Sequence, residues 1–310
     1  MRWVTIGLLL GALLAGCGGG SGPSDPPRTK SAPGSEALAR ERLAELERDG
    51  APDAELAEAL DELVRALGNA GKGSEQETLR LAKRALAQRE RIAGPDDPSL
   101  AQALSSLANI HYERAEYDQA DACSARAVAL LEKAPEGREE QLARTLSNRA
   151  MLLQRSGDYA GARAAAERAL RAGARAFETP GPQTAKTLAT LGLSCAALGD
   201  TGAARRRLGR SLRLRERLYG PDDVRVSFVL PGLAWVLERE GAVDKAREAL
   251  LRVARIRAAA FGEEDPRCAT PPEQLARLEQ RAGRSDHARE LLERAVALRE
   301  GTDEARPHPD

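Results

Sequence analysis

Residues 146–162 read LSNRAMLLQRSGDYAGA, and residues 188–204, which begin 42 positions later, read LATLGLSCAALGDTGAA. The same spacing of small residues continues on both sides without insertion or deletion. It forms three columns: Ala108, Ala150, Gly192, Ala234 and Ala276; Ala115, Gly157, Gly199, Gly241 and Gly283; and Ala120, Ala162, Ala204, Ala246 and Ala288. A period this regular predicts a solenoid in which each unit stacks only on its neighbours.

Each unit is predicted to be a pair of antiparallel helices. Leu104, Leu107 and His111 recur at helical spacing and define one apolar stripe. The small residue at position 115 is expected to end the first helix in a left-handed conformation, and Ala120 then lies on the inner face of the second helix. The 47 basic and 47 acidic residues balance, so no global field favours nucleic acid.

Two places depart from the pattern. Pro231 falls inside an expected first helix, where it should remove a backbone hydrogen bond and bend the helix. The unit before Ala101 is looser, because Gly71 stands 44 positions before Ala115 instead of 42. Residues 68–74, GNAGKGS, lack the spacing of a phosphate-binding loop and are predicted to be a turn.

The L-x-x-L-A and G-D-Y-x-x-A patterns resemble the tetratricopeptide repeat, and the 42-residue period with a Gly-Pro-Asp-Asp connection is similar to its kinesin-light-chain type. The resemblance implies an all-α fold, a right-handed superhelical solenoid of antiparallel helix pairs. About six units are expected over residues 51–300. Residues 35–50 are expected to form a capping helix with Leu38, Leu43 and Leu46 on its apolar face, and residues 301–310 a polar tail.

Residues 1–16 are predicted to be an export signal, since Arg2 precedes an apolar run too short to span a bilayer. The sequence Leu14-Ala15-Gly16-Cys17 resembles the bacterial lipobox, which implies cleavage before Cys17 and acylation of that residue. Residues 17–34, rich in Gly, Ser and Pro, would form a flexible tether. Gly at position 18 favours, by resemblance to enterobacterial sorting, the outer membrane facing the periplasm. The alternative is an ordinary secretory signal with a chance cysteine.

The sequence offers no argument for catalysis. No nucleophile–base set, metal-ligand spacing or cofactor motif is present, so no enzyme, metal or cofactor is predicted. Cys123, Cys195 and Cys268 are interpreted as small packing residues, with disulfide formation left open. His111 is interpreted as a core residue.

In the tetratricopeptide family, the first helices line a concave groove that binds partners. Phe228 and Trp235 are seven positions apart and are expected on one face of one helix, as anchors for a partner. The alternative, that Trp235 packs beneath the next unit, is equally open. Carried over column by column, the groove residues are Gln102, Asn109, Tyr112, Arg144, Met151, Gln154, Lys186, Phe228, Trp235, Glu238 and Arg277.

A second candidate surface is basic. Arg206, Arg210, Arg213 and Arg217 follow helical spacing and form one stripe, which could meet anionic lipid, lipopolysaccharide or an acidic partner. The alternative is a solvated helix face that serves solubility.

The predicted function is a lipid-anchored scaffold or adaptor for protein–protein interaction in the bacterial cell envelope. An envelope glycan- or anionic-lipid-binding lipoprotein is the alternative, and an enzyme is the least favoured class.

Overall fold

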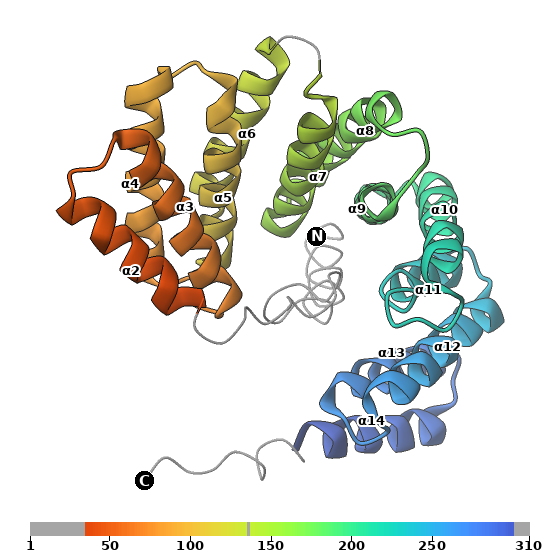
Figure 1. Cartoon of the computed structure of the whole chain (residues 1–310). Coiled ribbons are helices and arrows are strands. Elements are labelled where there is room, and N and C mark those ends of the chain that lie inside the picture. The colour runs from red at the N-terminus through yellow and green to blue at the C-terminus, as the bar shows by residue number, and fades with distance from the viewer. Residues whose placement is uncertain (1–34, 135–136, 301–310) are drawn as a thin grey trace, which may run out of the picture. The chain divides into compact units, whose positions relative to one another are not determined.

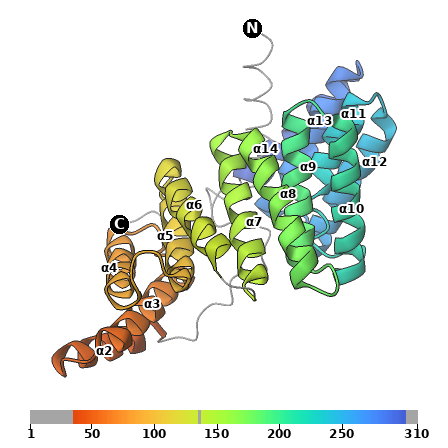
Figure 2. The ribbon, with the colours of Figure 1, turned by 90° about the horizontal axis from the view of Figure 1, so that it is seen from above.

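The computed structural model describes residues 35–134 and 137–300. Its described part is built from helices arranged as consecutive antiparallel pairs, with one further helix before the first pair (Figures 1 and 2). These described residues divide between Thr179 and Pro180 into two compact units, called here the N-terminal and C-terminal units. The N-terminal unit contains α2 (Ser35–Arg48), α3 (Asp53–Asn69), α4 (Gln76–Ala93), α5 (Ala101–Glu113), α6 (Tyr117–Lys133), α7 (Glu139–Ser156) and α8 (Tyr159–Ala176). The C-terminal unit contains α9 (Pro182–Ala197), α10 (Thr201–Tyr219), α11 (Leu230–Arg239), α12 (Val243–Phe261), α13 (Thr270–Arg281) and α14 (Ser285–Glu300).

The predicted turn column adopts the left-handed backbone that the sequence requires. Ala115 has φ +58°, and the glycines that share its column have φ between +77° and +90°. The turn after α5 is a Schellman motif: the N–H of Ala115 donates to the Tyr112 carbonyl at 3.0 Å and that of Glu116 to the His111 carbonyl at 2.9 Å. The same pair of bonds recurs after α9, α11 and α13. After α7, within the described residues, only the bond from the N–H of Gly157 to the Gln154 carbonyl forms, at 3.3 Å, so four of these first helices share the full motif and α7 has part of it.

The two alanine columns form the seam between paired helices. Ala120, Ala162 and Ala204 are fully buried, as are Ala150 and its column neighbours to within a few per cent of exposure. At Gly192 even a methyl group lacks room, because a Cβ there would lie 2.7 Å from Cγ of Leu208. Small side chains thus let α9 and α10 approach until the backbone of one meets the side chains of the other.

The effect of Pro231 differs from the sequence expectation. The proline does not bend a helix, because α11 begins only at Leu230 and Pro231 lies in its first turn. A proline costs little there, since the first helical N–H groups have no intrahelical partner. Residues 224–229 form turns instead, and α11 is 10 residues long where α9 has 16.

The helix α2 covers the open face of α3, as the sequence suggests, but with a different apolar set. Leu43 and Ala39 are buried and Leu46 packs on the same cluster, whereas Leu38 is 68% exposed, which corrects its assignment to the inner face. Ion pairs add to this contact: Arg40 donates to Glu77 of α4 at 2.6 and 2.8 Å, and Lys72 donates to Glu36 at 2.9 Å. The partly exposed geometry makes these pairs minor stabilisers.

In the C-terminal unit, the loops after α10 and after α12 are held by the same set of arginine contacts. Arg225 pairs with Asp223 and stacks 3.7 Å above the Tyr219 ring, and its carbonyl accepts a hydrogen bond from Arg215. After α12, one repeat later, Arg267 pairs with Asp265, stacks 3.7 Å above the Phe261 ring and accepts from Arg257 through its carbonyl. The arginine hydrogen bonds hold the pKa of both carboxyls below the ordinary aspartate value.

Candidate partner-binding site

A small hollow in the N-terminal unit lies between α5 and α7. Asn109, Tyr112 and Met151, three of the predicted groove residues, line it. Its volume is about 30 Å³, enough for one small group such as a side-chain methyl or amide. Asn148 also lines the hollow and was missed by the sequence argument, although it lies one helical turn before Met151 on α7. The structure therefore brings predicted residues from two neighbouring repeats to one place.

Two amide side chains of the hollow are available for a ligand. Asn109 is exposed and Asn148 half-buried, and neither amide has a partner within the part of the chain that the structure describes. An amide side chain both donates and accepts hydrogen bonds, as a peptide backbone does. Arg149, beside Asn148, is instead fixed by a hydrogen bond of 2.8 Å to Asp121 of α6.

Tyr112 is held in place at the edge of the hollow. Its ring meets that of Tyr117 edge to face, with centroids 6.0 Å apart, and the Arg155 guanidinium lies 5.9 Å from the Tyr112 centroid. Burial raises the pKa of the Tyr112 phenol, although the nearby Arg155 charge acts in the opposite sense. A fixed and half-buried aromatic ring contributes contact area at low entropic cost.

The other predicted groove residues of the N-terminal unit lie elsewhere. Gln102 and Arg144 are exposed, and Arg144 lies 3.5 Å from Glu140 on its own helix. Gln154 is only 5% exposed and has an interaction of its own. Its assignment to a partner-contacting surface is therefore corrected, because the end of α7 turns this side chain inward.

In the C-terminal unit, the predicted aromatic pair is not on one helix. Phe228 precedes α11, whereas Trp235 lies within it. Seven-residue spacing places two side chains on one face only within a single helix, and α11 begins after Phe228 because Pro231 occupies its first turn. Both side chains are half-buried. The Arg239 guanidinium, one turn beyond Trp235, lies 4.9 Å from the centre of the indole.

Charged groove residues of the C-terminal unit are partly neutralised. Glu238 of α11 accepts a hydrogen bond of 2.5 Å from Arg281 of α13. Arg277 is half-buried, and burial lowers the pKa of its guanidinium while Glu238 opposes this shift. Lys186 is half-buried and has an interaction of its own.

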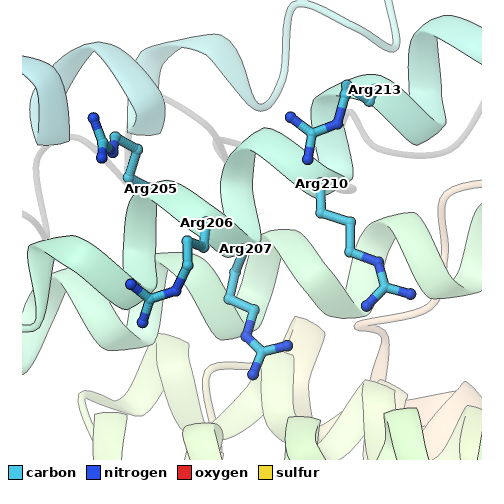
Figure 3. Close-up of a pocket in the computed structure, with 5 residues that line it drawn as sticks. All are labelled: Arg205, Arg206, Arg207, Arg210 and Arg213. Carbon is cyan, nitrogen blue, oxygen red and sulfur yellow. The ribbon is translucent and has the colours of Figure 1, made fainter.

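The basic stripe lies on α10, and Arg205 and Arg207 flank it. Arg205, Arg206, Arg207, Arg210 and Arg213 line a shallow, open recess of about 500 Å³, from which their side chains point in different directions (Figure 3). Arg205 lies 3.4 Å from Glu240. Arg206, Arg210, Arg213 and Arg217 are exposed, as the sequence predicts.

The residues considered for other chemistry are part of the core. Cys195 and Cys268 are buried, Cys123 is half-buried, and all three are free thiols. His111 is 5% exposed and its Nδ1 lies 2.5 Å from Glu116. Across residues 35–134 and 137–300, no three His, Cys, Asp or Glu side chains gather in a way that could hold a metal ion. None of the described helices combines the length and apolar character needed to cross a bilayer.

The family model for the tetratricopeptide repeat matches residues 55–133, 141–217 and 229–301. The chain belongs to this family. Tetratricopeptide-repeat proteins generally mediate protein–protein interaction and are generally not enzymes. No curated protein sequence matches the chain.

Solved structures share this fold at low sequence identity. BtubC (BKLC) from P. vanneervenii is 22% identical, with a TM-score of 0.63, over 75% of this chain and 93% of that one. A putative kinesin light chain from Podosopora anserina is 18% identical, with a TM-score of 0.55, over 66% and 96%. PilF of Pseudomonas aeruginosa is 20% identical, with a TM-score of 0.54, over 81% and 99%. The kinesin-light-chain-like architecture expected from the 42-residue period is thereby confirmed.

The predicted signal peptide, Cys17 and the tether lie outside the described residues, as does the polar tail.

Proposed function

We propose that this tetratricopeptide-repeat protein is a non-enzymatic scaffold that binds a protein partner through an extended peptide segment and is held at a bacterial envelope membrane by acylated Cys17. The observation that supports peptide binding is the hollow between α5 and α7. There, two amides without partners among the described residues lie beside Met151 and the fixed Tyr112 ring. The amides would pair with the backbone of the segment, and the hollow would take one small side-chain group from it.

The membrane part of the proposal is supported by sequence alone. A lipobox-like Leu-Ala-Gly-Cys follows a short apolar run, and a Gly- and Ser-rich stretch separates it from α2. The outer membrane, facing the periplasm, is the proposed location. A protein attached by two or more acyl chains stays on its membrane, whereas a single chain gives marginal binding.

A photo-crosslinking experiment in a producing bacterium tests peptide binding. A photoreactive phenylalanine analogue at the exposed Arg144, one helical turn before Asn148 on α7, should give one specific crosslinked product, and the same analogue at the exposed Ala129 of α6 should not. Asn148→Ala and Tyr112→Ala should each weaken that crosslink roughly tenfold. Tyr112→Phe, which keeps the ring, should retain it. Crosslinks of equal yield from both positions, or insensitivity to Asn148→Ala, would refute the groove.

The anchor has a separate readout. Cys17→Ala should move the protein from the membrane fraction to the soluble fraction and abolish metabolic labelling with a fatty acid analogue. A partner that still crosslinks at Arg144 in this variant would leave the scaffold proposal intact. Labelling that persists without Cys17 would refute the anchor alone.

A further inference from the structure

The arginine face of α10, defined as Arg206, Arg207, Arg210, Arg213 and Arg217, is a concentration of charge that the fold does not use. None of these arginines has an interaction partner within the part of the chain that the structure describes. Elsewhere most arginines are paired, for example Arg247 with Glu279 and Arg252 with Glu216. Arginines three and four positions apart on one helix repel each other and destabilise it.

The equivalent helix of the preceding repeat, α8, is less basic: it holds Arg168, Arg171 and Arg175 in the columns of Arg210, Arg213 and Arg217, but it differs at the columns of Arg206, Arg207 and Gly209. The columns of Arg206 and Gly209 hold Ala164 and Glu167 in α8. There Arg163 donates to Glu167 at 3.2 Å, so a carboxylate lies among the arginines of α8. In α10 a glycine stands in place of that carboxylate, and Arg206 and Arg207 stand where α8 has Ala164 and Ala165.

The next repeat gives the same comparison. In α12 the columns of Arg206 and Gly209 hold Glu248 and Leu251, so the surface that is basic in α10 is mixed there. Three helices with the same fold therefore differ at these two columns, and the difference cannot come from what the helix pair needs for packing.

Gly209 is also unexplained by packing. A Cβ added there would meet only Nη1 of Arg213, at an ordinary distance of 3.6 Å, so alanine would fit. Glycine in a helix interior is unfavourable relative to alanine. By helical spacing Gly209 lies between Arg206, Arg210 and Arg213, so its bare backbone leaves space among their guanidinium groups. The helix thus carries two unfavourable features, a glycine and clustered like charges, at one place.

We propose that the arginine face of α10 docks on the phosphate groups of an anionic lipid bilayer. Guanidinium groups bind phosphate oxygens through two parallel N–H bonds, and the recess of about 500 Å³ gives such groups access from the solvent side. From Arg206 to Arg217 the stripe extends about 16 Å along the helix, enough to reach several lipid headgroups. A bilayer fits better than an acidic protein, because the stripe itself contains no aromatic or aliphatic anchor of the kind on which protein interfaces depend.

Docking of this face does not require a partner bound at α5 and α7. A vesicle-binding experiment without any partner therefore measures docking alone. The full chain carrying Cys17→Ala, which has no acylation site, is mixed with vesicles of pure phosphatidylcholine or of phosphatidylcholine with 30% phosphatidylglycerol, at about 0.1 M salt. The ratio of the two partition coefficients is measured. The apolar N-terminal segment contributes to both vesicle types, so the ratio reports electrostatic docking.

The expected result is a preference for anionic vesicles that disappears on neutralising α10. Each arginine near an anionic surface contributes roughly a fivefold factor, so Arg206→Ala/Arg210→Ala/Arg213→Ala should lower the ratio about 10²-fold. Gly209→Glu, which introduces the residue of α8, should lower it several-fold, whereas Gly209→Ala should leave it unchanged. Circular dichroism confirms that each variant is folded.

The matched control removes the same charge from elsewhere. Arg171, Arg175 and Arg255 are exposed, and Arg171 and Arg255 occupy the column of Arg213 in other repeats. Their combined replacement by alanine should lower the ratio by no more than a few-fold. An equal loss in the two triple variants would overturn the proposal, as would a wild-type ratio near one or a Gly209→Glu variant that binds like wild type.

Discussion

Exchanging glycine and alanine in the left-handed turn column should change stability in opposite directions at different turns. Ala115 is the column's one non-glycine member, with φ +58°, and it is exposed. An L-residue pays about 1–2 kcal/mol in this region, and glycine loses about 0.5–1 kcal/mol more than alanine in chain entropy on folding. Ala115→Gly should therefore stabilise the α5–α6 pair by about 0.5–1 kcal/mol.

The reverse exchange, glycine to alanine, should change the free energy of unfolding by a similar amount in the opposite direction. Gly199 has φ +84°, further than Ala115 from the left-handed minimum near +57°, and no atom lies within 4 Å of where its Cβ would be. Gly199→Ala should thus destabilise the α9–α10 pair by about 1 kcal/mol through the backbone alone.

Repeat arrays need not unfold in one step, so a single melting temperature is a poor measure here. Amide hydrogen exchange followed by mass spectrometry resolves the peptides of α5, α6, α9 and α10 separately, and it reports the local opening free energy of each pair. Slower exchange in α5–α6 for Ala115→Gly and faster exchange in α9–α10 for Gly199→Ala are expected. A destabilised Ala115→Gly variant, or an unchanged Gly199→Ala variant, would refute the conformational argument.

Three further changes test packing and charge. Gly192→Ala should destabilise by about 1–2 kcal/mol despite its better helix propensity, because its Cβ would lie 2.7 Å from Cγ and 3.1 Å from the backbone nitrogen of Leu208. In a double-mutant cycle measured by urea unfolding, a Leu208→Ala background should reduce that penalty without abolishing it, since the backbone contact remains. Glu279→Gln should cost about 2 kcal/mol, read as faster exchange in α13, since this carboxylate is only 2% exposed and accepts from two arginines. Asp223 and Asp265 have lowered pKa values in the folded state, so their contribution is complete above the unfolded value of about 3.9 and is lost as pH falls through the folded values. The urea midpoint of Asp223→Asn/Asp265→Asn should therefore fall less steeply than that of wild type between pH 5 and 3.

Most of the architecture could be predicted because the period fixes the turn within each helix pair and the small residues of the seam between the two helices. Ala115 and the glycines of its column needed no tertiary information, since a left-handed residue is required at that phase in every turn. Arg206, Arg210, Arg213 and Arg217 follow helical spacing and are all exposed, whereas Arg207 beside them is half-buried.

The candidate site was predicted less completely, because column arithmetic assumes that every repeat has the same helix. Pro231 moves the start of α11 to Leu230 and takes Phe228 out of the helix, which spacing from Trp235 could not reveal. The burial of Gln154 depends on how the end of α7 meets its neighbours. Asn148 lines the hollow because two neighbouring repeats pack together there. The sequence of a single repeat does not show which of its residues contact the next repeat.

The recurring Schellman turns limit how the length of this protein can change. Removing residues 158–199 would join Gly157 to Asp200, which reproduces the Gly-Asp turn that already ends α7, and every downstream column would keep its phase. Removing a single residue inside a helix would instead rotate all later side chains of that helix by about 100° and turn its inner alanines toward water. Changes of one or a few residues are tolerated only in the loops. The turn at Gly71 is an example, since it stands 44 positions before Ala115, two more than the period. Such a chain can gain or lose whole repeats by recombination, and a binding surface carried by one repeat can be inherited, copied or discarded as a unit.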